Sequence, residues 1–94
     1  MAPMNSPKTQ ENAEILALEG LGWLVGEEEG VRRFMEQAGV DAATLRQAAG
    51  SPDMGLAVLE FLLGHEDLLL RFCESAGVTP KDLHLARHQM GGGA

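Results

Sequence analysis

The sequence predicts an all-α fold: a compact bundle of five to six helices, built as two tandem three-helix units with pseudo-two-fold symmetry. Apolar residues recur at helical spacing between about residues 10 and 90, and no stretch alternates with the period of two that is typical of a strand. Tyrosine is absent and β-branched residues are few, which also disfavours sheet. The third observation is that the chain resembles itself when it is shifted by 38 residues.

This self-similarity covers most of the chain. Residues 18–48 align with residues 56–86 without a gap, and 13 of the 31 aligned positions are identical. The pattern Phe-x-Glu-x-Ala-Gly-Val occurs in both copies and includes a helix end, so chance similarity between two amphipathic helices explains it poorly. Repeats of about 20–50 residues usually correspond to stacked supersecondary units. We therefore expect one unit at about 11–50 and a second at about 51–90.

Each unit is expected to hold two longer helices and a short one. The longer helices are predicted at 11–25 and 27–38 in unit one, and at 52–63 and 65–76 in unit two. Ser51 followed by Pro52 indicates a helix start, because the serine caps the first turn and the proline lacks only an N–H that would have no partner there. In the second helices, Glu29 with Arg33 and Asp67 with Arg71 are spaced for ion pairs one turn apart.

The third helices are expected to follow Gly39 and Gly77, each placed to end a helix in the left-handed conformation. Asp41 and Thr79 are the predicted caps of these helices. In both units, apolar residues directly before the cap and four positions after it form a hydrophobic staple: Val40 with Leu45, and Val78 with Leu83.

The length of 94 residues is typical of one domain, which we place at 10–90. Residues 1–9 contain two prolines and no apolar periodicity, so we expect a disordered N-terminal tail. Residues 91–94 are expected to be a flexible C-terminal tail. The first residues lack the apolar segment of a signal peptide, and no apolar run approaches the roughly 20 residues that span a bilayer.

The charge balance is acidic, with 14 Asp and Glu against 7 Lys and Arg and a formal net charge of −7. Nucleic-acid binding requires a basic surface that displaces counterions from phosphates, so it is disfavoured here. Binding to an anionic membrane is disfavoured for the same reason. The single cysteine, Cys73, excludes an intrachain disulfide and fits a reducing compartment, so we expect a cytoplasmic protein.

The first helix of each unit is apolar on most of its circumference, which places these two helices at the centre of the bundle. In unit one, a stripe on one side is formed by Leu18, Leu21, Leu24 and Val25. Trp23 lies on the other side, with Gly20 beside it to allow a close helix approach, and Phe61 is its equivalent in unit two. Trp23 and Phe61 have two interpretations: central burial, or an exposed patch used for a partner or for dimerisation.

The two units differ in apolar surface. Gly30 and Arg32 of unit one correspond to Leu68 and Leu70 of unit two. Something must cover these leucines: the N-terminal segment before residue 15, a second copy of the chain, or another protein. The candidate interaction surface is therefore formed by Trp23, Phe61, Leu68 and Leu70.

No set of residues predicts catalysis, a cofactor or a bound metal. His84 and His88 have the i,i+4 spacing of metal ligands, but no third ligand accompanies them and they are expected to face solvent. Cys73 is expected in the core, where a thiol is inert. Glu19 and Glu60 are expected on the narrow solvent-facing sides of the central helices. We therefore expect no enzyme, although a metal-dependent one stays a third alternative.

Several motifs carry a family likeness. Leu18-Glu-Gly-Leu-Gly-Trp-Leu24 and Val58-Leu-Glu-Phe-Leu-Leu-Gly-His-Glu-Asp-Leu-Leu-Leu70 resemble a small bacterial family, chiefly alphaproteobacterial, catalogued as a domain of unknown function. The likeness spans about residues 15–88. It implies a compact helical protein of about this length, encoded alone, with no assigned activity and no known catalytic residues.

The leading functional hypothesis is a non-enzymatic protein–protein interaction or regulatory module, which binds an unknown protein partner or associates with itself. It depends on the surplus of apolar surface described above. The alternative is a small apolar-ligand-binding protein, with the ligand between the two helical units.

Overall fold

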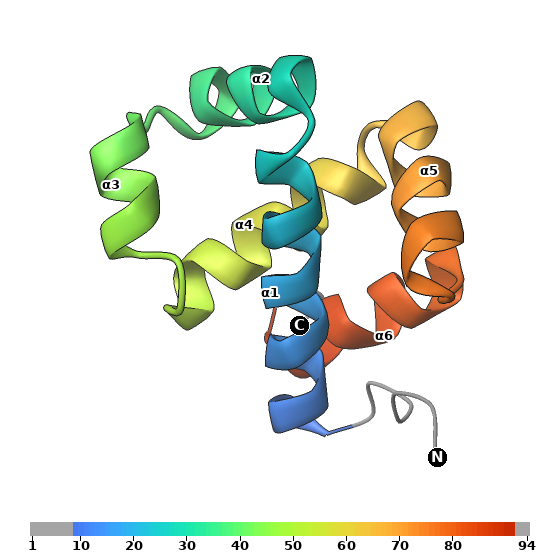
Figure 1. Cartoon of the computed structure of the whole chain (residues 1–94). Helices are drawn as coiled ribbons and strands as arrows, with labels where there is room; N and C mark the ends of the chain where they lie inside the picture. Colours follow the sequence, from blue (N-terminus) through green and yellow to red (C-terminus); the bar gives the residue numbers. More distant parts are fainter. Residues whose placement is uncertain (1–8, 92–94) are drawn as a thin grey trace.

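The computed structural model describes residues 9–91. These residues form six α-helices and no strand, which confirms the all-α prediction (Figure 1). In chain order the helices are α1 (Gln10–Val25), α2 (Glu28–Ala38), α3 (Ala42–Gln47), α4 (Pro52–Leu63), α5 (Glu66–Ala76) and α6 (Pro80–Gln89). Most of the predicted N-terminal tail and residues 92–94 of the predicted C-terminal tail lie outside the described residues. None of the helices in the described range has the length and apolar character that crossing a membrane requires.

The helix starts follow local sequence signals. Four helices begin after a residue whose side chain accepts a hydrogen bond from a backbone N–H in the first turn: Thr9, Asp41, Ser51 and Thr79. Thr79 and Asp82 form a reciprocal capping box at α6. A cap of this kind stabilises a protein by about 1 kcal/mol. The predicted caps Asp41 and Thr79 and the predicted start at Ser51 are confirmed.

Two glycines end the second helix of each unit in the same way. Gly39 and Gly77 both have φ of 72°, in the left-handed region. The N–H of the next residue, Val40 or Val78, donates to a carbonyl five residues back at 3.1 Å. This is the Schellman arrangement, which satisfies carbonyls that the helix end leaves free. The left-handed prediction for both glycines is therefore confirmed.

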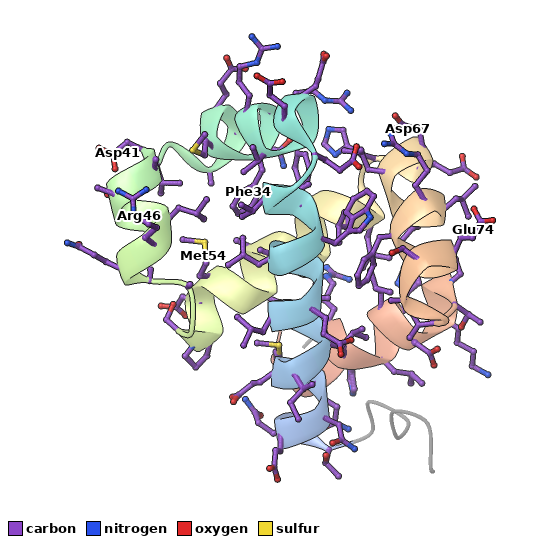
Figure 2. All side chains as sticks on the ribbon, in the orientation of Figure 1. Phe34, Asp41, Arg46, Met54, Asp67 and Glu74 are labelled. Atoms are coloured by element: carbon purple, nitrogen blue, oxygen red, sulfur yellow. The ribbon has the colours of Figure 1, made fainter. Side chains whose placement is uncertain are left out.

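Helices α1 and α4 cross at the centre of the molecule, and α6 packs against both (Figure 1). Gly20 permits the close approach of α1 and α4, because a Cβ at this position would lie 3.3 Å from atoms of Val58 and Leu62. Helices α2 and α5 lie over one end of this pair, and Phe34 points from α2 into the interior (Figure 2). The largest fully buried side chains are Leu16, Leu24, Phe34, Val58, Leu59, Phe61, Leu62, Phe72 and Leu83.

Arginines connect the two halves of the chain. Arg33 of α2 lies 3.7 Å from Asp67 of α5, and Arg71 of α5 pairs with Glu27 directly before α2. The sequence spacing predicted pairs within each helix instead, and in the structure both arginines reach the opposite unit. These ion pairs are exposed, so each contributes no more than about 1 kcal/mol to stability.

The third helices of the two units pack differently. Helix α6 is 10 residues long and contacts α1 and α4 extensively, whereas α3 is 6 residues long. Within the described chain α3 has no comparably extensive contact with another helix, and it lies to one side in Figure 1. The structure therefore does not confirm the predicted pseudo-two-fold symmetry of the two units, because α3 and α6 pack differently.

Candidate interaction surface

Two of the four residues predicted to form an interaction surface lie in the core. The side chains of Phe61 and Leu68 are 1% and 2% exposed. Phe61 packs edge-on against Phe34, with the ring centroids 5.3 Å apart. For Phe61, the structure has the central burial that was one of the two interpretations. Neither side chain is accessible to a partner while the chain is folded.

The chain itself covers Leu68. Leu68 packs beside Gly30 of α2, where a Cβ would lie 3.5 Å from Cδ2 of the leucine, an ordinary van der Waals separation. Leu68 is 2% exposed in the single chain, so its burial requires neither a second copy nor another protein.

Trp23 is half-buried and covered by residues of α5. Its ring lies against Phe72, with the centroids 5.8 Å apart. The guanidinium carbon of Arg71 lies 5.7 Å from the centroid of the Trp23 ring, and Glu27 pairs with the same guanidinium. A cation over an indole face is attracted by the ring electrons. Trp23 therefore joins α1 to α5, and residues of α5 cover part of its ring.

Leu70 is the one residue of the predicted set with a largely exposed side chain, at 51%. It lies on α5, on a turn whose other apolar residues face the core. Because Phe61 and Leu68 are buried, the four residues do not form a single exposed surface.

A different set of apolar residues is exposed, on α1. Ile15, Leu18 and Val25 are 45%, 52% and 56% exposed, and they make up three of the four exposed large hydrophobic residues in the described range. Their spacing of three and seven residues places them on one side of the helix. We call Ile15, Leu18 and Val25 the α1 stripe. At about 1.5 Å per residue it is about 15 Å long.

The α1 stripe corrects the sequence interpretation of this helix. Leu18 and Val25 were grouped with Leu21 and Leu24 in one stripe of a nearly buried helix, yet only Leu21 and Leu24 are buried. The reason is that α4 and α6 cover one side of α1, and α3 is too short to cover the other.

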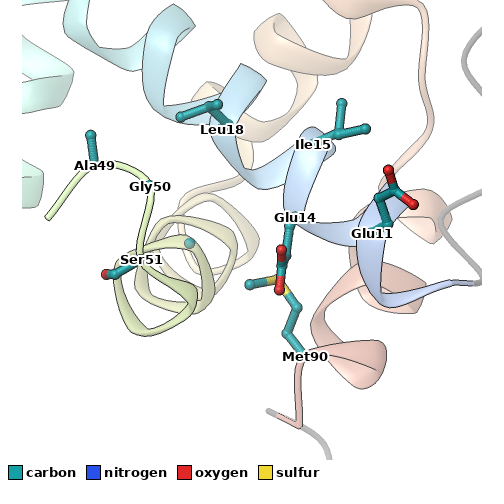
Figure 3. A pocket seen from close by; sticks show the side chains of 9 residues that line it. Glu11, Glu14, Ile15, Leu18, Ala49, Gly50, Ser51 and Met90 are labelled. Carbon is teal, nitrogen blue, oxygen red and sulfur yellow. The ribbon is translucent and has the colours of Figure 1, made fainter.

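A hollow of about 230 Å³ lies beside the N-terminal half of the α1 stripe (Figure 3). Its walls come from α1, from the connection between α3 and α4, from α4 and from the residue after the end of α6. They include Glu11, Glu14, Ile15, Leu18, Ala49, Gly50, Ser51, Gly55 and Met90. Met90 reaches toward Gly55, where a Cβ would lie 3.0 Å from the Met90 Cε atom.

A second hollow, of about 280 Å³, lies beside the C-terminal half of α1. It lies between α1, α2 and α3 and opens to solvent on one side, and its lining is apolar except for Arg46. The lining residues are Leu21, Val25, Val31, Met35, Ala42, Leu45, Arg46 and Ala49. Ala49 lines both hollows. We call the two hollows and the α1 stripe together the α1–α3 groove.

The charges along the α1–α3 groove are unequal at its two ends. Glu11 and Glu14 line the first hollow, Glu19 follows Leu18 on α1, and all three are exposed. Helix α1 contains no lysine or arginine. Arg46 of α3 lies at the second hollow. Within residues 9–91, the ion pairs of Arg33, Arg71 and Arg87 use other carboxylates, so none of these three arginines neutralises the acidic end of the groove.

The residues with reactive side chains differ in burial and do not gather into a metal-binding cluster within residues 9–91. Cys73 is 6% exposed, and burial, with a smaller contribution from the Asp82 carboxylate, raises the pKa of its thiol. A raised pKa disfavours the nucleophilic thiolate. His84 and His88 are exposed on α6, and the described residues contain no cluster of three potential metal ligands.

His65, Glu19 and Glu60 have local roles or none. Nδ1 of His65 lies 2.8 Å from the carbonyl oxygen of Phe61, and the imidazole stacks on the Phe61 ring at 4.2 Å. Glu19 and Glu60 are exposed, as the sequence predicted, and Glu60 accepts a hydrogen bond from Arg87 at 3.3 Å.

The sequence contains a pattern that indicates the apolar face of α1 at the α1–α3 groove. Ile15, Leu18, Gly22 and Val25 follow the alternating spacing of three and four residues that marks one face of a helix. The same helix has a second apolar face, with Leu16, Gly20 and Leu24. Which of these two faces receives the neighbouring helices depends on tertiary packing, so periodicity alone did not reveal it.

The chain belongs to the family described as protein of unknown function (DUF3572), whose model matches residues 10–93. The predicted resemblance to a domain of unknown function is therefore confirmed. The search of curated proteins and the search of solved structures each found no match.

Proposed function

We propose that this member of the DUF3572 family is a non-enzymatic protein–protein interaction or regulatory module that binds its partner through the α1–α3 groove. The observation that carries the proposal is the α1 stripe, in which Ile15, Leu18 and Val25 remain about half exposed on one side of a central helix. Exposed apolar area costs about 25 cal/mol per Å² relative to burial. Contiguous apolar patches on a folded chain often mark interaction sites.

The hollows strengthen this proposal. Protein partners are anchored mainly by a few side chains that fill pockets at the centre of an interface. The α1–α3 groove offers two such pockets, of about 230 and 280 Å³, next to the apolar side chains of α1. A partner that filled both would cover the α1 stripe between them.

A non-enzymatic role is favoured by the burial and the raised pKa of the Cys73 thiol. Cys73 lies in the core with a raised pKa, away from the α1–α3 groove. The same free, buried cysteine is compatible with the predicted cytoplasmic location, where thiols stay reduced.

The proposal is tested by comparing two leucines of equal exposure. Leu18 of the α1 stripe is 52% exposed and Leu70 of α5 is 51% exposed. Tagged wild-type chain, Leu18→Glu and Leu70→Glu are used as baits in a lysate of the source organism, and captured proteins are quantified by mass spectrometry. We expect a protein that wild type and Leu70→Glu retain and Leu18→Glu loses. If all three baits capture the same proteins in equal amounts, the proposal is wrong.

A small apolar ligand remains a second candidate function, at a different place from the one first expected. Buried side chains fill the contact between α1 and α4. The hollow between α1, α2 and α3, by contrast, is open to solvent and has an apolar lining. Native mass spectrometry of freshly purified chain tests this function. A bound small molecule that is lost in Leu45→Arg supports it, and an unliganded mass for the wild-type chain contradicts it.

A further inference from the structure

We infer that the occupant of the α1–α3 groove is a basic amphipathic helix of a partner protein. This inference rests on the proposed function, because it specifies the chemistry of the partner at the same site. Three observations carry it: the length of the groove, the internally bonded backbone of its long wall α1, and its charge.

The length of the groove matches a helix of ordinary size. Its lining runs along α1 from Glu11 to Val25. At a rise of about 1.5 Å per residue, this is about 21 Å, or roughly four turns. A partner helix of similar length would place apolar side chains at i, i+3 or i+4, and i+7 along the α1 stripe, as in helix-in-groove recognition.

The groove favours a helix over an extended peptide. An extended peptide exposes its N–H and C=O groups and needs backbone partners, as it finds at the edge of a sheet. The long wall of this groove is α1, whose backbone groups are bonded within the helix, and the second hollow is lined by apolar side chains except for Arg46. A helix satisfies its own backbone groups, so it loses no backbone hydrogen bonds when it is buried there.

The charge of the groove favours a basic partner. Glu11 and Glu14 line its first hollow, Glu19 lies next to Leu18, and α1 carries no basic residue. Lysines or arginines that flank the apolar side of a partner helix would lie opposite these carboxylates. Arg46 at the other end fits an acidic side chain or the negative C-terminal end of the partner helix.

The same charges disfavour a second copy of this chain. Each chain has a formal net charge of −7, and contact between two α1 stripes would bring together two helices with three glutamates and no basic residue each. Like charges at an interface oppose association. The three glutamates therefore favour a basic partner over a second copy.

Synthetic peptides test this inference on the full chain. The probe is a fluorescent amphipathic helix of leucine and lysine, about four turns long. It is compared with a version in which glutamate replaces lysine and with a scrambled version of identical composition. We expect the lysine helix to bind at least about tenfold more tightly than either comparison peptide, as measured by fluorescence anisotropy at about 0.15 M salt.

Paired variants show whether the peptide binds the α1–α3 groove. Leu18→Gln is expected to weaken binding about tenfold, and Leu70→Gln is the control at equal exposure. The double variant Glu11→Gln/Glu14→Gln is expected to weaken binding about threefold or more. Its control is Glu36→Gln/Glu74→Gln, which removes the same charge from exposed positions on α2 and α5. Circular dichroism checks that each variant is folded.

Several results would overturn the inference. Equal losses in the groove and control variants would show that the peptide is attracted only by the net charge of the chain. Peptide binding that appears only after removal of residues 1–8 would show that this segment is the occupant. A dimer in sedimentation that Leu18→Gln dissociates would identify a second copy. The proposed function is tested separately by the lysate experiment. It fails if no captured protein depends on Leu18, whatever the result with the synthetic peptides.

Discussion

Helices α3 and α6 occupy aligned positions in the two units and begin in the same way, yet they pack differently. Both come after a left-handed glycine, and both have a side-chain cap, Asp41 or Thr79. Helix α6 buries Leu83 and Ala86 at 0% exposure against α1 and α4. Helix α3 buries only Leu45, at 6%, and has the open second hollow beside it. A cap determines where a helix begins and does not determine how well the helix packs.

The difference arises from the residues on the C-terminal side of each helix. Ser51 and Pro52 start α4 shortly after α3 ends at Gln47, and a proline cannot continue a preceding helix. Helix α6 is the last helix within the described residues and continues to Gln89. The additional turn of α6 extends along α1 and α4, whereas the side of α1 near α3 stays open as the α1–α3 groove.

The largest expected difference in the free energy of unfolding is between alanine variants of Leu83 in α6 and Leu45 in α3, the leucines that each helix buries. Leu83→Ala should lower the free energy of unfolding by about 3 kcal/mol, because it leaves a sealed cavity at the centre. Leu45→Ala should cost about 1 kcal/mol, because the adjacent hollow is already open to solvent. Urea denaturation followed by circular dichroism measures both values. Equal losses would show that α3 is packed as firmly as α6.

The two left-handed glycines provide a comparison in which we expect equality. Gly39→Ala and Gly77→Ala should each lower stability by about 1 kcal/mol, because alanine is strained at positive φ. A Cβ at either position would meet nothing within 4 Å, so strain is the only cost. Thermal unfolding of both variants tests this expectation. A difference larger than the experimental error would mean that the two turns are not equivalent.

A smaller change in the free energy of unfolding is expected when the pH is lowered and Asp41, the cap of α3, becomes protonated. A hydrogen bond from the Thr44 backbone N–H lowers the pKa of Asp41 from its usual 3.8. The carboxylate cap therefore stabilises the fold above the unfolded-state value, and this contribution is lost as the pH falls through the lowered pKa. Asp41→Ser, whose cap does not titrate, should be less stable than wild type at pH 7 and should approach it on acidification. A stability gap that is unchanged from pH 7 to pH 2 would contradict this assignment.

The smallest effect on folding is expected at the α1 stripe. Leu18→Gln should change the free energy of unfolding by less than about 0.5 kcal/mol, because the side chain is already about half exposed to solvent in the folded chain. Leu16→Ala, on the buried side of the same helix, should cost about 3 kcal/mol. Chemical denaturation of the two variants separates the two faces of α1. A large loss in Leu18→Gln would mean that this residue is part of the core.

Local features of this fold were predictable from the sequence, and the choice of buried face was not. The starts and ends of helices at Ser51, Gly39 and Gly77 depend on a few adjacent residues, so they can be inferred from backbone chemistry. Leu18 and Leu24 are chemically alike, and the positions of the neighbouring helices decide that one is exposed and the other buried. For the same reason, the sequence pattern did not predict that the α1 stripe is exposed.

The cover of Leu68 shows a different limit of sequence reasoning. The alignment of the two units revealed a leucine in place of Gly30, and we interpreted it as surplus apolar surface. The two aligned residues are neighbours across the molecule, since a Cβ at Gly30 would lie within van der Waals distance of Cδ2 of Leu68. That contact becomes visible only when the mutual orientation of α2 and α5 is known.

The contact between Gly30 and Leu68 has a consequence for the history of this chain. A Cβ at Gly30 would already lie 3.1 Å from Leu24 and 3.5 Å from Leu68, so a side chain larger than alanine at this position would compete for space with Leu24 first and then with Leu68. If the two units descend from one ancestral segment, they became unlike at this point and can no longer replace each other. Across relatives of this chain, the two positions should vary together, with their combined volume nearly constant.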